Sequence, residues 1–241
     1  MPATAENAVL MRSRSLPRRD DYFYFGMSFV VVAVICYGFG QTVDSNLLHA
    51  TPRRPFLLYV HALTFSAWIF FYVIQSALVR VHKVPLHRTL GYFGAALGFS
   101  VFVLGIWIAI VMGRFHGARA FGPVLFLSFS DTTAFAVLFA LGIWFRRKPE
   151  FHRRFLFLAT CVLTSAGFGR FPIQWFADHW FYLGVDCLIL TGALHDIFLQ
   201  GRVHPVYRIA LPSLVALQLV GAYVAFTPDP TWIRIAYRML S

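Results

Sequence analysis

The sequence predicts an all-α membrane protein whose single domain is a bundle of seven transmembrane helices. The chain of 241 residues is 59% hydrophobic and only 13% charged, whereas a soluble domain carries about 25% charged residues. Its mean hydropathy is +0.66. The apolar residues gather in segments of about 20 residues, the length that a membrane-spanning helix needs. Most Lys and Arg residues lie between these segments.

Seven apolar segments follow one another along the chain, and each is long enough, or nearly so, to cross a bilayer as a helix. They comprise residues 22–41, 56–79, 89–113, 123–145, 155–172, 177–199 and 208–227. The fifth is the shortest and ends in Ser-Ala-Gly-Phe-Gly-Arg-Phe. Because glycine weakens a helix, this segment is expected to stop short or bend. Residues 22–227 are therefore predicted to form one transmembrane domain.

The two ends of the chain flank this domain. Residues 1–21 are polar and hold four arginines, and no small-residue cleavage site closes the apolar segment that follows. They are therefore predicted to be a basic cytoplasmic tail and not a cleaved signal peptide. Residues 228–241 form two faces if they are helical: apolar Trp232, Ile235, Ala236 and Met239, and basic Arg234 and Arg238. This pattern predicts a short amphipathic helix in the outer interface of the membrane.

The distribution of Lys and Arg predicts the orientation. With the N-terminus inside, the inner tail and loops hold 14 of these residues and the outer segments hold 7. Cytoplasmic loops carry the excess of positive charge. The sequence thus predicts an N-terminus inside and a C-terminus outside. The net charge of +11 is explained by this topology, so no nucleic-acid partner is expected.

Several ionisable residues lie in the outer half of the predicted helices. With a rise of 1.5 Å per residue, Asp131 lies about 12 Å and Asp186 about 14 Å from the outer ends of their helices. A charged group facing lipid costs at least about 2.5 kcal/mol, so these residues should face the interior and pair. Arg170 is a candidate partner for either carboxylate. His179 and Tyr182 share one helical face with Asp186 because their spacings are three and four residues.

These residues, together with His61, predict an intramembrane site that opens outward. The catalytic candidates are Asp131, Arg170, Tyr182 and Asp186, and the cofactor-binding candidates are His61 and His179. The alternative is a structural salt bridge, with polar side chains at helix ends that reach the headgroups.

A second group of histidines lies near the predicted inner surface. The candidate metal ligands there are His87, His152, His195 and His204. His82 and Asp196 are predicted to lie near the same inner surface. Imidazole and carboxylate groups are common metal ligands. The alternative is that these histidines lie beside Pro and Arg at the headgroups, because no pair has the spacing HxxxH.

Cofactor chemistry is only partly restricted by the sequence. A haem b bound between helices needs histidines on facing helices, and His61 and His179 lie at similar predicted depth. A retinal pigment is excluded because a Schiff base needs a lysine within a helix, and Lys83 and Lys148, the two lysines, lie in predicted loops. The three cysteines form neither CxxC nor CxxCH, so a thiolate zinc site and covalent haem attachment are not expected.

Three stretches of the chain resemble a group of multi-pass membrane proteins of bacteria. They are VHALTFSAWIFFYVIQSALVRVHKVPLHRTLG, KPEFHRRFLFLAT and GRVHP. The resemblance covers about half of the chain, between the second predicted helix and the inner loop after the sixth. The matching positions are His61, Gln75, His87, Arg88, Gly91, His152, Arg153, Arg170, His204 and Pro205. The resemblance implies a multi-pass topology in the cytoplasmic (inner) membrane of a bacterium, and it implies no particular activity.

Three functions fit the sequence. The first is a haem- or metal-dependent redox protein acting on a lipophilic substrate such as a quinone or a lipid, since no soluble domain is present to bind a polar cofactor. In this function Asp131, Arg170 and Asp186 tune charge and deliver protons. The second is a proton-coupled carrier or small-molecule binder in which the two carboxylates take protons. The third is an accessory subunit that packs against other membrane subunits, which suits the 27 phenylalanines.

Overall fold

The chain folds into a helical bundle. The computed structural model describes residues 19–227 and 230–240, and for residues 19–21, 118–120, 179 and 230 it describes only the backbone. The long helices are α2 (Arg19–Gly40), α3 (Phe56–Arg80), α4 (Val84–His116), α5 (Ala118–Trp144), α8 (Phe181–Gln200) and α9 (Pro205–Phe226). The shorter elements are α6 (Pro149–Val162), α7 (Ser165–Phe168), α10 (Pro230–Leu240) and the π-helical turns η1 (Asp44–Leu48) and η2 (Phe176–Trp180). No strand occurs in the described residues.

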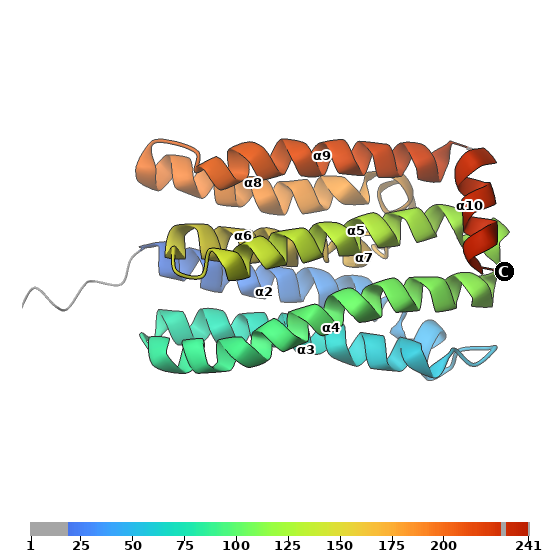
Figure 1. Cartoon of the computed structure of the whole chain (residues 1–241), viewed down its shortest axis with the longest axis horizontal. Coiled ribbons are helices and arrows are strands. Elements are labelled where there is room, and N and C mark those ends of the chain that lie inside the picture. Colours follow the sequence, from blue (N-terminus) through green and yellow to red (C-terminus); the bar gives the residue numbers. More distant parts are fainter. Residues whose placement is uncertain (1–18, 228–229, 241) are drawn as a thin grey trace, which may run out of the picture.

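The long helices lie side by side along one axis (Figure 1). Helices α8 and α9 form one side of the bundle and α3 and α4 the other, with α2, α5, α6 and α7 between them. We call the end where α2 begins the N-terminal end; it also holds the turns at residues 81–83, 145–148 and 201–204. The opposite end, the C-terminal end, holds residues 41–55 and α10.

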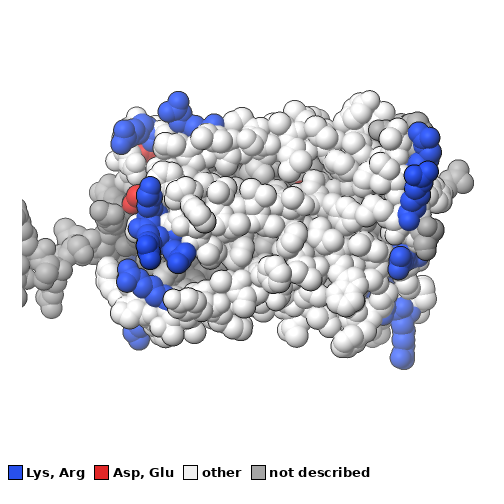
Figure 2. All heavy atoms as spheres, viewed as in Figure 1, with Lys and Arg blue, Asp and Glu red and all other residues white. Residues whose placement is uncertain are grey.

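Six of the helices are long and apolar enough to cross a membrane: α2, α3, α4, α5, α8 and α9. Their outward faces carry large apolar side chains, with Phe198 83% and Trp144 78% exposed. On the face shown in Figure 2, Lys and Arg gather at the two ends of the bundle, and the broad band between them shows neither. The chain is therefore built as a multi-pass helical membrane protein, since charged side chains avoid the hydrocarbon layer.

The fifth predicted segment is not one helix, so six continuous helices of spanning length are found in the described residues where seven were expected. Residues 155–172 divide into α6, which ends at Val162, and the single turn α7. Residues 169–173 then follow without helical structure. Gly167 lies in α7 where this turn meets α2, and a Cβ atom added at Gly38 of α2 would lie 2.1 Å from the carbonyl oxygen of Gly167. Two glycines thus allow the backbones of α2 and α7 to come into direct contact.

Helices α4, α6 and α9 begin at or beside a proline, three to six residues before the apolar pattern predicts. Helix α4 begins at Val84, just before Pro85, and α6 and α9 begin at Pro149 and Pro205 themselves. Proline suits the first turn of a helix because its φ angle is already helical and its missing N–H has no partner to lose there. The prolines beside the inner histidines are therefore helix starts and not parts of the loops.

Helix α10 lies across the C-terminal end of the bundle (Figure 1). Ala236 and Leu240 are buried, and the indole Nε1 of Trp232 donates a 2.8 Å hydrogen bond to the carbonyl oxygen of Gly122 in α5. The packed face is therefore Trp232–Ala236–Leu240, at four-residue spacing, while Ile235 is exposed. The predicted segment 228–241 is thus an amphipathic helix over its described part, and residues 228–229 and 241 lie outside that part, as do residues 1–18 of the predicted tail.

Candidate intramembrane site

Asp131, near the middle of α5, is the centre of the site. The hydroxyl group of Tyr182 on α8 donates to its Oδ1 at 2.8 Å, and the hydroxyl group of Ser165 on α7 donates to its Oδ2 at 2.6 Å. Both carboxyl oxygens are thus bound by neutral donors from two other elements. Within the part of the chain that the structure describes, no basic side chain forms an ion pair with Asp131.

Ser165 reaches this site because the helix is interrupted just before it. Helix α6 ends at Val162, and the hydroxyl group of Thr164 in the break donates to the carbonyl oxygen of Cys161 at 2.6 Å. Ser165 is then the first residue of α7 and is buried. Hydroxyl side chains compete with helical hydrogen bonds in this way. Ser165 was not predicted as a site residue, although the glycines that follow it indicated that the helix stops short or bends.

Tyr182 reaches the site because α7 and α8 pack closely. A Cβ atom added at Gly184 of α8 would lie 2.6 Å from the ring of Phe168 in α7, so glycine is needed for this contact. Asp186 follows Tyr182 by one helical turn on the same face of α8, as the spacing predicted. The structure therefore brings together Asp131 and Tyr182, with Asp186 one turn away.

Asp186 has a different environment from Asp131. Its Oδ1 is buried and has no hydrogen-bond partner among the described residues. The buried side chain of Gln218 on α9 faces the carboxyl group. A buried polar atom without a partner is rare in proteins, and a catalytic role or contact with a water or an ion is a usual reason for one.

Arg170 does not pair with either carboxylate, in contrast to the expectation from the sequence. Its guanidinium group donates to the carbonyl oxygen of Ala166 and lies over the ring of Phe39, with 4.3 Å between the guanidinium carbon and the ring centroid. The last carbonyl groups of a helix have no partners within the helix. Because α7 ends at Phe168, one of them provides Arg170 with a local acceptor.

His61 lies on α3, with its ring centroid 4.0 Å from that of Phe65. Its Nδ1 is buried without a hydrogen-bond partner in the described structure, and the charge of Arg170 lies nearby. The side chain of His179 lies outside the described residues, so the predicted facing pair of His61 and His179 stays a prediction. His61 is the candidate cofactor ligand for which the structure shows an available ring nitrogen.

Two further polar side chains follow His61 along the same face of α3. Trp68 and Gln75 come seven and fourteen residues later, and seven residues are close to two full helical turns. The indole Nε1 of Trp68 and both amide atoms of Gln75 are buried without partners in the part of the chain that is described. Unpaired polar groups are costly inside a membrane. This face of α3 is therefore suited to contact polar atoms of a ligand or of water.

The strongest electrostatic contact lies nearer the N-terminal end of the bundle. Arg154 of α6 and Asp196 of α8 are both fully buried and form a bidentate ion pair. Nε of Arg154 donates to Oδ2 of Asp196 at 2.9 Å, and Nη2 donates to Oδ1. Glu150 accepts a further hydrogen bond from Nη1 of Arg154 at 2.7 Å. Arg154 was not predicted as a site residue because it lies among basic residues typical of an inner loop. The spacing of four residues from Glu150 is the one local signal of this role.

The predicted metal ligands His87 and His152 lie side by side, with 6.2 Å between their ring centroids. The Nδ1 atom of His152 is 2.8 Å from the carbonyl oxygen of Gly142, a hydrogen-bonding distance. This contact joins the end of α5 to the start of α6, so His152 has a structural partner.

The other two predicted metal ligands have separate surroundings. The ring of His195 stacks on Phe23 with 3.9 Å between centroids. Nδ1 of His204 accepts a 3.2 Å hydrogen bond from the backbone N–H of Val206 and so caps α9. Burial, and then the charge of Arg154, lowers the pKa of His204. In the described ranges no group of three or more His, Cys, Asp or Glu residues is placed to hold a metal ion, so the structure does not bring the four histidines together as one metal centre.

Comparison of the chain with models of protein families, with curated proteins and with solved structures finds no match. The function is therefore inferred from the geometry of the site. The residues that converge there offer a carboxyl group between two hydroxyl groups and a second carboxyl group one turn away. Such a site can hold and release protons and can hydrogen-bond a small polar group.

Proposed function

We propose that this protein binds a small molecule inside the bundle and exchanges protons at Asp131 and Asp186, as a proton-coupled carrier does. The observation that carries the proposal is the carboxyl group of Asp131, bound on both oxygens by neutral hydroxyl groups of Ser165 and Tyr182 beside an interrupted helix. The proposed setting is the cytoplasmic membrane of a bacterium.

The partners of Asp131 suit both of its protonation states. A hydroxyl group can donate to a carboxylate, and after rotation of its O–H bond it can accept from a carboxylic acid. Tyr182 and Ser165 can therefore keep their contacts when Asp131 gains a proton. A guanidinium group cannot accept a hydrogen bond, so an arginine partner would hold the carboxyl group in its charged form.

The interruption of the helix supports a binding role. Non-helical backbone at membrane depth is tolerated where protein buries it or where it lines a cavity. Interrupted helices form the binding sites of many carriers because their free ends offer polar backbone groups. Residues 163–173, whose one helical part is the single turn α7, provide such a segment next to Asp131.

The topology completes the proposal. We infer that α6 and α7 together make a seventh crossing, which puts the two termini on opposite sides of the membrane. This arrangement fits α2 beginning at one end of the bundle and α10 lying at the other (Figure 1). The larger number of Lys and Arg residues in residues 1–21 and in the turns of the N-terminal end supports the proposal that this end faces the cytoplasm.

The other functions that fit the sequence stay predictions. A redox role with haem or a metal, acting on a quinone or a lipid, is supported by the available Nδ1 of His61. An absorption spectrum of the purified protein tests it, since bound haem gives an intense visible band. A role as an accessory subunit predicts that partner proteins copurify in fixed ratio.

Infrared difference spectroscopy of the purified full-length protein tests the proposed proton exchange without knowledge of the substrate. The spectrum between acid and neutral pH should contain carboxylic-acid C=O bands from groups inside the bundle. We expect D131N to remove one such band and D186N another. Asp44, exposed at the C-terminal end, provides the control, and D44N should leave both bands in place. A D131N spectrum identical to that of the wild type would show that Asp131 does not exchange protons.

Transport measurements in proteoliposomes complete this test. A transported small molecule, added outside the vesicles, should drive proton movement that a pH-sensitive dye inside the vesicles records, because a coupled carrier moves protons together with its substrate. D131N and D186N should each abolish it while their thermal unfolding stays cooperative. Unchanged proton movement in both variants would contradict the proposed carrier role.

A further inference from the structure

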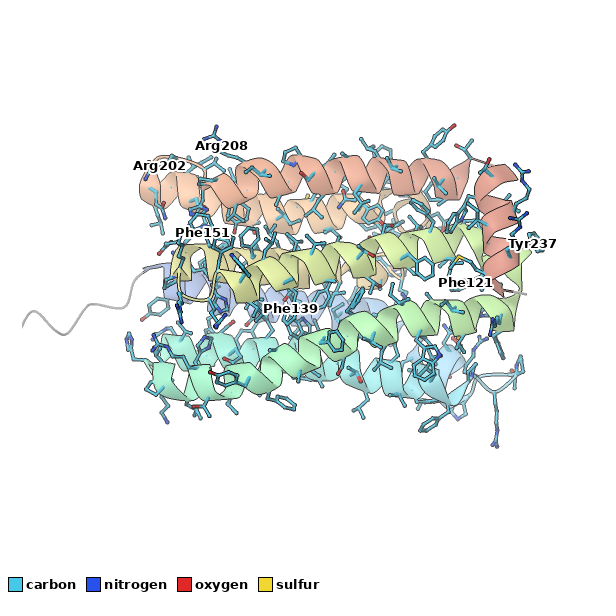
Figure 3. The ribbon with its side chains drawn as sticks, in the orientation of Figure 1. Phe121, Phe139, Phe151, Arg202, Arg208 and Tyr237 are labelled. Atoms are coloured by element: carbon cyan, nitrogen blue, oxygen red, sulfur yellow. The ribbon has the colours of Figure 1, made fainter. Side chains whose placement is uncertain are left out.

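A basic hollow lies at the N-terminal end of the bundle, where α8 turns into α9. Its volume is about 310 Å³, and the residues that line it are Gln200, Arg202, Val203, His204, Pro205 and Arg208. Figure 3 shows Arg202 and Arg208 at this turn, on the outer side of the bundle. The hollow lies apart from Asp131 and does not depend on the proposed carrier function.

The two arginines of the hollow differ from those of the neighbouring ion pair. Arg154 is bound by Asp196 and Glu150. Arg202 and Arg208 are exposed and form no ion pair or hydrogen bond with any residue that the structure describes. The hollow therefore carries two positive charges that have no ion-pair partner among the described residues, which favours an anionic ligand.

The turn that frames the hollow has a defined shape. Gly201 adopts a left-handed backbone conformation with φ +67°, which favours glycine. The backbone N–H of Val206 can only donate, so Nδ1 of His204 accepts and the ring proton of the neutral imidazole lies on Nε2. His204 thus offers one donor beside the two guanidinium groups.

Apolar surface continues from the hollow along both helices. Phe198 of α8 is 83% exposed and Ile209 of α9 is 70% exposed, and both lie within a few residues of the turn. A ligand that is anionic at one end and apolar along the rest of its length would contact both surfaces. Basic pockets at the cytoplasmic ends of membrane helices bind anionic lipid headgroups for this reason.

We propose that the hollow between α8 and α9 binds the phosphate headgroup of an anionic phospholipid, with Arg202, Arg208 and His204 as donors and the acyl chains along Phe198 and Ile209. Guanidinium groups match the geometry of phosphate oxygens and form bidentate hydrogen bonds with them. A volume near 300 Å³ is within the range of small-ligand sites.

Binding measurements on the purified full-length protein in a neutral detergent test this site. The probes are short-chain phosphatidylglycerol, phosphatidylcholine with the same acyl chains, and inorganic phosphate. The wild type should bind phosphatidylglycerol, and R202Q/R208Q should weaken that binding by about tenfold or more, because it removes both guanidinium groups that line the hollow and bind the phosphate. The matched control is R88Q/R147Q, which removes two exposed arginines of the same end that do not line the hollow, and it should bind as the wild type does.

Each remaining outcome overturns the proposal in a different way. Equal binding of phosphatidylglycerol by R202Q/R208Q and the wild type would show that the hollow is not the site. Equal binding of phosphatidylcholine and phosphatidylglycerol would show that headgroup charge is not recognised. Inorganic phosphate binding as tightly as phosphatidylglycerol would identify a soluble phosphate compound, and not a lipid, as the ligand.

Discussion

Asp131 and Asp196 are two aspartates inside the same bundle with opposite kinds of partner. Each receives hydrogen bonds on both carboxyl oxygens. Those of Asp196 come from the guanidinium group of Arg154, and those of Asp131 come from the hydroxyl groups of Ser165 and Tyr182. The first arrangement joins two opposite charges that must stay together, and the second leaves a carboxyl group that can change its charge.

The different partners of Asp196 and Asp131 suggest different roles for the two residues, one in stability and the other in the proposed proton exchange. The Arg154–Asp196 pair joins α6 to α8 and has no exposed side chain, so its energetic role depends on both charges being present. The contacts of Asp131 join α5, α7 and α8 without a buried charge of opposite sign. We therefore expect substitutions at the ion pair to affect folding most, and substitutions at Asp131 to affect proton exchange most.

The largest effect is expected for D196N. This change leaves Arg154 buried without its main counter-charge, and removing one partner of a buried ion pair costs about 3–5 kcal/mol. Glu150 retains its contact with Arg154 but lies partly in solvent, so it offsets little of the loss. The free energy of unfolding in detergent measures the effect. The double variant R154M/D196L should recover much of the lost stability because it removes both charges; a double variant as unstable as D196N would contradict a role based on charge pairing.

The next largest effect is expected for G38A. The added Cβ atom would lie 2.1 Å from the carbonyl oxygen of Gly167, and such overpacking costs about 1–3 kcal/mol. The displacement of α7 would also move Ser165 away from Asp131. Thermal unfolding and the infrared band of Asp131 should both change.

The control for this variant lies on the same helix. An alanine at Gly26 would meet no atom within 4 Å, and replacing glycine by alanine inside a helix stabilises it by about 0.5–1 kcal/mol. G26A should therefore raise the unfolding temperature where G38A lowers it. Equal effects of the two variants would show that the contact between α2 and α7 is not tight.

The sequence predicts most of the fold because a membrane restricts the choices. Spanning segments must be apolar over about 20 residues, so six of the seven predicted segments match long helices within a few residues. The glycines of segment 155–172 also indicated the interruption. The early starts of α4, α6 and α9 were missed because Pro85, Pro149 and Pro205 were interpreted as loop residues.

The sequence predicts less of the site because pairing between distant residues is a tertiary property. Asp131, Tyr182 and Asp186 were found from depth and helical spacing. The partner of Asp196 is 42 residues away, and the four-residue spacing from Glu150 is the one local feature that distinguishes Arg154 from arginines that set topology. Arg170 was assigned to a carboxylate because the end of α7, whose carbonyl group it binds, is not visible in the apolar pattern.

A moderate effect is expected for Y182F. The change removes one of the two hydrogen bonds to Asp131 and little else, and a hydrogen bond to a charged group contributes about 1.5–3 kcal/mol while one to a neutral group contributes about 1 kcal/mol. The loss of stability should therefore be larger at a pH where Asp131 is ionised than at one where it is protonated. Unfolding measured across pH tests this. The variant Y37F, which alters an exposed tyrosine of α2, should show no such dependence.

The smallest effect on stability is expected for D131N, the same substitution that is most damaging at Asp196. Asparagine keeps one oxygen that accepts from Tyr182, and its amide group can donate to the hydroxyl oxygen of Ser165, which accepts as well as donates. No buried charge loses its partner, so the free energy of unfolding should change by less than about 1 kcal/mol. The free energies of unfolding of D131N and D196N, measured under the same conditions, test this difference. If D131N were as destabilised as D196N, Asp131 would be a structural anchor of the same kind, and the division between a fixed ion pair and a proton-exchanging carboxyl group would not hold.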